Sequence, residues 1–295
     1  MIRKTALILA FTAVVFVLQA PTPAEAQGGR KQRKAKQSPT PVAESAPEAS
    51  ASSSAPAADA ASPSAGQPSP EPDSVWREVE PEILAYAIAP ARATLARAKD
   101  PAAAGTLVAE GRILTLETKY ADAVARFDRA AASAPDDPAP LVYKGEAQLY
   151  ARQEAAARQS FAEAKRRAQR QVDRDAGNRD ALYHLGVAQQ RLGEHDAAYA
   201  TLERARALAP GDERILYQMG ATRFLQQRWQ PAFDLMTQAL ERNARLAYAY
   251  WLRGNAAGQI DRKDVMLNDL RRFVELAPDA PEAERARRTL ATLRG

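Results

Sequence analysis

A glycine recurs at regular intervals through most of the chain, and this repeat limits the fold more than any other feature. The five marks are Gly111, Gly145, Gly186, Gly220 and Gly254, and neighbouring marks are evenly spaced except for the second and third. Large and small apolar residues recur at fixed distances from each glycine, as interlocking helix faces require. Periods of about 20–50 residues are typical of solenoids. The sequence therefore predicts an all-α chain of stacked helix pairs.

The most complete copy of the pattern spans residues 179–212. It places Leu182 and Gly186 in a first helix, then Ala198, Leu202 and Pro210 in and after a second helix. This order matches the pattern W-x2-L-G-x2-Y…A-x3-F…P, so the chain resembles the tetratricopeptide repeat (TPR) family. The resemblance implies a right-handed α-solenoid of about five helix-turn-helix units whose role is to hold another protein.

The pattern divides the folded region into units. The five units are 104–137, 138–171, 179–212, 213–246 and 247–280. The seven extra residues 172–178 are expected to add about two turns to the preceding helix. Residues 281–295 fit a C-terminal capping helix, which a solenoid needs to cover its open end.

Residues 74–103 are also helical in character. They either cap the other end of the array or form a degenerate sixth unit. Pro81 and Pro90 are expected to break this segment into pieces.

The segment 1–73 differs in composition from the rest of the chain. Residues 1–26 resemble a signal peptide, with Arg3 and Lys4, an apolar run, and a small-x-small pattern that predicts cleavage before Gln27. Residues 27–73 are expected to form a disordered linker that is basic at first and then rich in Pro, Ala and Ser. The chain is thus expected to be exported to the periplasm or cell envelope. The alternative is an anchor formed by an uncleaved N-terminal apolar segment.

Five basic residues at 30–36 follow the cleavage pattern, although positive charge there favours the cytoplasmic side. They either bring the linker close to an anionic membrane or cell wall, or belong to a solvated tail.

The residues that catalysis or metal binding would need are scarce. The chain has no Cys, so a Cys-based metal site is excluded. The separation of His184 and His195 is not a metal-ligand spacing on one helix. No P-loop, Gly-x-Ser-x-Gly or Rossmann pattern occurs. Residues 74–295 hold 34 basic and 30 acidic side chains, too even a balance for a nucleic-acid footprint. We therefore expect no enzyme activity, cofactor, metal or nucleic-acid partner.

The TPR resemblance implies that first helices line a concave groove for a protein or peptide. Tyr183, Tyr217 and Trp251 stand three residues before their glycines, at a position that the resemblance places in this groove. The alternative is that the rings pack against the neighbouring repeat. Other residues expected near the groove are His184, Gln218, Phe224, Arg191, Asn255, Tyr143 and Arg112.

The sequence leaves two functions open. The first is a scaffold that binds a partner in the groove. It would lack the Lys and Asn pair with which some TPR domains hold a chaperone's C-terminal carboxylate, because no unit has that pair. The alternative is a structural envelope-tethered subunit that self-associates or binds cell-wall polymer.

Overall fold

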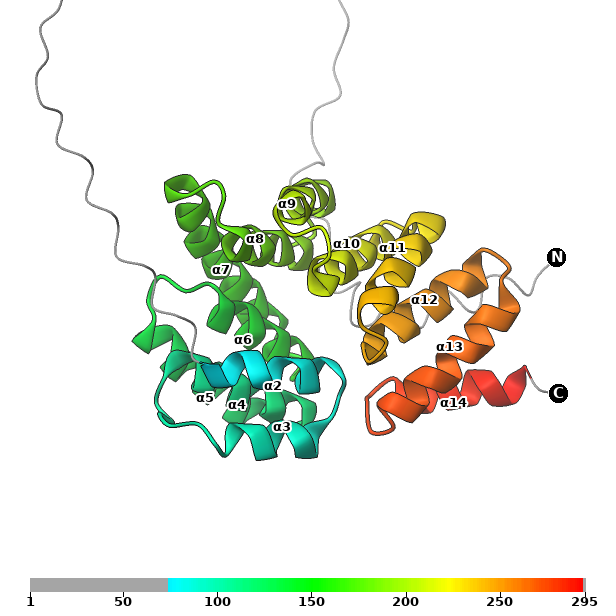
Figure 1. The fold of residues 1–295 in the computed structure, drawn as a ribbon, viewed down its shortest axis with the longest axis horizontal. Helices are drawn as coiled ribbons and strands as arrows, with labels where there is room; N and C mark the ends of the chain where they lie inside the picture. The colour runs from blue at the N-terminus through cyan, green and yellow to red at the C-terminus, as the bar shows by residue number, and fades with distance from the viewer. Residues whose placement is uncertain (1–73, 294–295) are drawn as a thin grey trace, which may run out of the picture. The chain divides into compact units, whose positions relative to one another are not determined.

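The chain is described by a computed structural model that covers residues 74–293. The expected signal peptide and linker lie outside these described residues. Between residues 74 and 293 the chain is built from helices joined by short turns and contains no strand, which confirms the predicted all-α class (Figure 1).

Each of the five glycines lies in the first helix of a pair. The first helices are α4 (Ala104–Leu116), α6 (Ala139–Tyr150), α8 (Arg179–Arg191), α10 (Glu213–Leu225) and α12 (Ala247–Gln259). Their partners are α5 (Tyr120–Ser133), α7 (Glu154–Arg174), α9 (His195–Leu208), α11 (Trp229–Arg242) and α13 (Lys263–Leu276). Each second helix packs on its own first helix and on the next one along the chain. The last helix, α14 (Ala283–Thr292), packs on α13 and buries Ala283 and Ala286.

The repeated glycine has a steric cause. A Cβ atom on Gly145 would lie 2.6 Å from Cε1 of Phe161, and the same distance separates a Cβ on Gly111 from Phe127. Both phenylalanines come from the second helix of the pair and are fully buried. The missing side chain therefore lets the second helix place a ring directly against the backbone of the first, which tightens each pair.

The turn between the two helices of a pair needs a left-handed residue. This residue stands seven positions after the glycine in every unit, with φ between 58° and 86°; the five are Thr118, Arg152, Gly193, Gln227 and Asp261. The sequence singled out Gly193 for a positive φ, and its φ is 86°. A side chain at this position costs about 1–2 kcal/mol, so four of the units accept some backbone strain.

The helices α2 (Ser74–Leu84) and α3 (Ile88–Leu95) follow the same register. Val79 takes the glycine position: the left-handed Tyr86 (φ 59°) follows it by seven positions, and the fully buried Ala91 follows it by twelve. The pair has the register of a sixth, degenerate unit. The expected break at Pro81 was wrong, because Pro81 lies inside α2 and the break comes at the turn around Tyr86. Pro90 lies in the first turn of α3, where no backbone N–H is needed.

The extra residues after unit two lengthen α7 as the spacing predicts. This helix has 21 residues, while the other second helices of the five units have 14. Arg167 donates to the carbonyl oxygens of Ala131 and Asp137, and Arg174 pairs with Asp136 at 3.1 Å. The basic run of α7 thus braces the turn that precedes α6.

Candidate functional site

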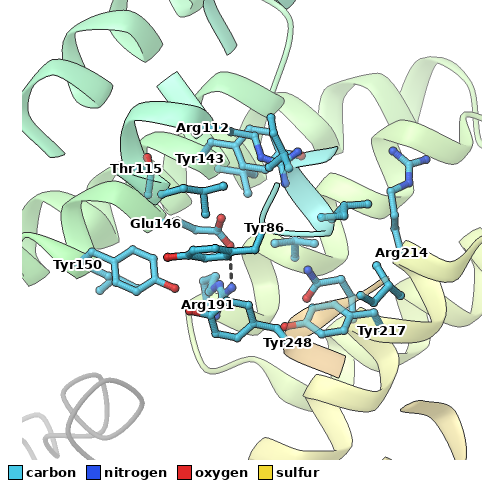
Figure 2. Close-up of a pocket in the computed structure, with 18 of the residues that line it drawn as sticks. Tyr86, Arg112, Thr115, Tyr143, Glu146, Tyr150, Arg191, Arg214, Tyr217 and Tyr248 are labelled. Carbon is cyan, nitrogen blue, oxygen red and sulfur yellow. Dashed lines mark hydrogen bonds and ion pairs between the residues drawn. The ribbon is translucent and has the colours of Figure 1, made fainter. Parts of the chain in front are cut away.

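A hollow of about 210 Å³ opens on the side of the array that the first helices line. Its walls come mainly from the five first helices, with further residues from the end of α2, from the turn between α2 and α3, and from α5 (Figure 2). Six of the chain's nine tyrosines line it, together with three arginines and a single acid, Glu146. The tyrosines are Tyr86, Tyr143, Tyr150, Tyr183, Tyr217 and Tyr248. This concentration marks the hollow as the candidate functional site.

The tyrosine rings form an aromatic wall with polar tips. The rings of Tyr86 and Tyr248 lie 6.2 Å apart, and Figure 2 shows both beside the Arg191–Glu146 pair. The Tyr248 hydroxyl donates to a carboxylate oxygen of Glu282 over 2.6 Å. Burial raises the pKa of Tyr86 to about 12, and burial likewise raises the pKa of Tyr183 to about 12. Both phenols are therefore neutral at ordinary pH and can donate or accept hydrogen bonds.

Charged side chains stand between the rings. Arg191 of α8 donates to Glu146 of α6 over 2.6 Å. Arg112 of α4 and Arg214 of α10 both approach Glu80 of α2, with contacts of 3.5 and 3.0 Å. The hollow thus combines apolar area with arginines that are each paired with a carboxylate, which suits contact with a chain that carries both apolar and charged groups.

The structure brings six of the ten predicted site residues to the hollow. These are Tyr183, Tyr217, Gln218, Arg191, Tyr143 and Arg112. Tyr183 and Tyr217 are half-buried. Arg112 also lies over the Tyr143 ring, with Cζ 4.4 Å from the ring centre.

The other four, which are Trp251, Phe224, Asn255 and His184, do not line the hollow. Trp251 is buried, and its ring lies 5.2 Å from that of Phe273 on α13, the second helix of the same unit. Phe224 is buried against Trp229, and Asn255 donates to the carbonyl oxygen of Trp251. His184 packs beside the hollow rather than in it, and its ring lies 5.1 Å from that of Tyr183. Burial lowers the pKa of His184 below its usual value.

The misplacement has a geometric reason. In α4 the hollow is lined from Arg112 to Leu116, beyond the repeat glycine, whereas in α12 it is lined by Tyr248 and Ala249, before the glycine. From α4 to α12 the lining positions therefore shift toward the helix N-terminus, with α6 and α8 lined over the same register positions. The position three residues before the glycine therefore lines the hollow in α8 and α10 but not in α12. This explains why Trp251 does not line the hollow, whereas Tyr248 does.

Sequence reasoning missed several lining residues. Tyr86, Tyr150, Tyr248, Glu146 and Arg214 line the hollow but were not predicted, although Arg214 and Tyr248 both stand six positions before their repeat glycines. A signal was present for Tyr86, because it stands where each unit places its left-handed turn residue. Glu146 stands one position after its glycine, as Arg112 does, and Tyr150 stands five positions after its glycine, as Arg191 does, so the register of the predicted residues also pointed to these two.

Over residues 74–293, no group of three or more His, Asp or Glu side chains is placed to hold a metal ion. In the same part of the chain, the helices are too short or too polar to cross a bilayer.

Comparison with known proteins addresses the fold. The sequence matches no protein-family model and no curated protein. Among solved structures, a thermophilic TPR protein of Thermus thermophilus, TTC0263, is similar with a TM-score of 0.50 and 20% identity, over 64% of this chain and 98% of that one. YrrB, described as a TPR protein with an unusual peptide-binding site, is similar with a TM-score of 0.37 and 20% identity, over 69% of this chain and 99% of that one. The first likeness shows that the described residues have the TPR fold.

Proposed function

Starting from a chain that folds as a tetratricopeptide-repeat array, we propose that it is a non-enzymatic scaffold that binds a partner protein or peptide in the tyrosine-lined hollow. The observation that carries the proposal is the gathering of six tyrosines from five helix pairs around one opening. Tyrosine supplies large contact area at low cost in side-chain entropy, and its hydroxyl adds hydrogen bonds. The hollow is smaller than the usual small-ligand pocket of about 300–1,000 Å³, so it suits one or two side chains of a partner.

We propose further that the scaffold works in the periplasm or cell envelope. The support comes from the sequence of residues 1–26, which has a charged start, an apolar run and a cleavage pattern. Mass determination of the purified protein from a producing bacterium tests this. A mature chain that begins at Gln27 supports export, and a chain that retains residues 1–26 contradicts cleavage.

The binding proposal is tested by affinity capture with paired variants. The double substitution Tyr183→Ala and Tyr217→Ala removes two rings from the hollow, and we expect it to abolish partner capture while the helical circular dichroism is kept. Tyr199→Ala is the matched control, because Tyr199 lies on the second helix α9 and does not line the hollow. Capture that survives the double substitution would exclude the hollow as the binding site.

A further inference from the structure

Two of the three arginines at the wall of the hollow, Arg112 and Arg214, share one carboxylate. Arg214 Nη1 lies 3.0 Å from Oε2 of Glu80, and Arg112 Nη1 lies 3.5 Å from Oε1 of the same side chain. These groups are largely shielded from solvent, with side chains 14% (Glu80), 15% (Arg112) and 22% (Arg214) exposed. Shielded ion pairs of this kind are stronger than pairs in open water. The arginines line the hollow, whereas Glu80 reaches them from α2.

Each of the three arginines at this wall is paired with a carboxylate. Arg191 is matched by Glu146 at 2.6 Å, and Arg214 is also held by Asp212 at 2.9 Å. Arg112 has no carboxylate partner besides Glu80 among the ion pairs of the described residues, and otherwise contacts the rings of Trp76 and Tyr143. The three arginines thus face three carboxylates, and without Glu80 the wall would carry one surplus positive charge.

We propose that Arg112 and Arg214 form a carboxylate-binding pair of the hollow, that Glu80 occupies this pair in the structure described here, and that an acidic side chain of the partner peptide replaces Glu80 while a neighbouring apolar side chain enters among the tyrosines. This inference rests on the proposed function, because it names the chemistry of the partner that the same hollow binds. The partner is an internal peptide segment with a Glu or Asp beside an aromatic or aliphatic residue.

The exchange keeps both arginines paired with a carboxylate. One carboxylate leaves the arginines and another arrives, so no buried guanidinium is left unpaired, which would be costly. Arg214 keeps Asp212 throughout. Glu80 can turn away from the arginines while α2 stays in place, because Val79 and Ile83 hold the helix in its own apolar cluster. The hollow then gains the apolar contacts of the partner's second side chain.

The test uses the full chain, immobilised, and three pooled sets of short peptides with blocked ends. Each peptide carries Phe and Leu at varied spacing from one test residue, which is Glu in the first set, Gln in the second and Lys in the third. Blocked ends ensure that the only carboxylates are side chains. Retained peptide is measured by mass spectrometry. We expect the Glu set to be retained about tenfold more than the Gln set, as a charged hydrogen bond implies, and the Lys set to be retained least.

Three variants of the full chain separate the roles. Glu80→Gln removes the built-in carboxylate, so retention of the Glu set should rise several-fold. Glu82→Gln is the matched control, because Glu82 lies on the same helix and pairs with Arg245 at 2.8 Å, and neither residue lines the hollow. Arg214→Gln should abolish the preference for Glu over Gln. Circular dichroism and thermal melting of each variant identify any that unfolds, and in that case Arg112→Gln replaces Arg214→Gln.

The outcomes distinguish a failure of the carboxylate exchange from a failure of the proposed binding function. Equal retention of the three sets, a preference for Lys, or no gain from Glu80→Gln overturns the exchange. If the peptides are retained without charge preference and Tyr217→Ala removes that retention, the inference fails but the hollow remains a binding site. If no set is retained and capture also survives Tyr183→Ala with Tyr217→Ala, both fail.

Discussion

Glu80 and Arg214 stand 134 residues apart in the chain, yet a carboxylate oxygen of the first lies 3.0 Å from Nη1 of the second. The pair joins α2 of the degenerate unit to α10 of the fourth unit. The Tyr86–Tyr248 contact, with ring centres 6.2 Å apart, joins the turn between α2 and α3 to α12 of the fifth unit. Units of a simple solenoid touch only their neighbours. In this array the first helix pair is therefore coupled directly to units that are distant in sequence.

The Glu80–Arg214 coupling should appear in a double-mutant cycle. We expect Glu80→Gln and Arg214→Gln each to lower the free energy of unfolding by about 1–3 kcal/mol, with a coupling energy of about 1 kcal/mol. The control cycle on Glu82 and Arg245, whose side chains are 24% and 53% exposed, should give a coupling below about 0.5 kcal/mol, as exposed pairs do. Urea unfolding measures all of these quantities. Strictly additive effects for Glu80 and Arg214 would show that the contact contributes no coupling.

The glycine in each pair should resist even the smallest side chain. Gly145→Ala places a methyl group 2.6 Å from the Phe161 ring, which is fully buried and cannot move away freely. We expect a loss of about 1–3 kcal/mol, although alanine by itself favours a helix by about 1 kcal/mol. Gly211→Ala is the control, because a Cβ there would meet only Arg242, at 3.9 Å. The Gly211→Ala variant should change stability by less than about 0.5 kcal/mol. Thermal unfolding of both variants measures the two changes, and equal changes would contradict the steric explanation.

Much of the fold was predictable because the packing that defines it is local. Gly145 and Phe161 belong to the same unit and keep a fixed spacing, so the sequence shows the pair directly. The degenerate unit was harder to identify, because Val79 stands where the other units have glycine. Its Tyr86 and Ala91 still keep the spacing of the other units, and a search for spacing rather than residue type would have found them.

The site was only partly predictable because it depends on how units turn relative to one another. Tyr183 and Tyr217 were predicted correctly because the position three residues before the repeat glycine lines the hollow in both α8 and α10. Trp251 has the same register but lies one unit further on, where that position is buried. Glu80 and Arg214 are joined by folding alone, since nothing in the sequence relates residues so far apart.

Alkaline pH should lower the free energy of unfolding through Tyr86. Burial raises the pKa of Tyr86 to about 12, with a further contribution from the charge of Glu282, whereas an unfolded tyrosine has a pKa of about 10. The folded state binds the phenol proton more tightly, so the stability from Tyr86 is fully present below pH about 10 and is lost as pH rises through about 12. Tyr86→Phe should flatten the decline of unfolding free energy above pH about 10, while Tyr199→Phe, outside the hollow, serves as the matched control. A decline of the same steepness in Tyr86→Phe and in the unmodified protein would contradict this assignment.

Trp251 and Tyr217 share a register position but should respond differently to the same substitution. Trp251 is only 4% exposed and lies against Phe273, so Trp251→Ala leaves a cavity and should cost about 3–5 kcal/mol. Tyr217 is half-buried at the wall of the hollow. Tyr217→Ala should therefore cost less stability than Trp251→Ala and should weaken partner capture at a temperature where both proteins are folded. Denaturant unfolding and affinity capture on the same preparations separate the two effects. A Trp251→Ala protein of normal stability that has lost its partner would mean that the binding surface extends to the fifth unit after all.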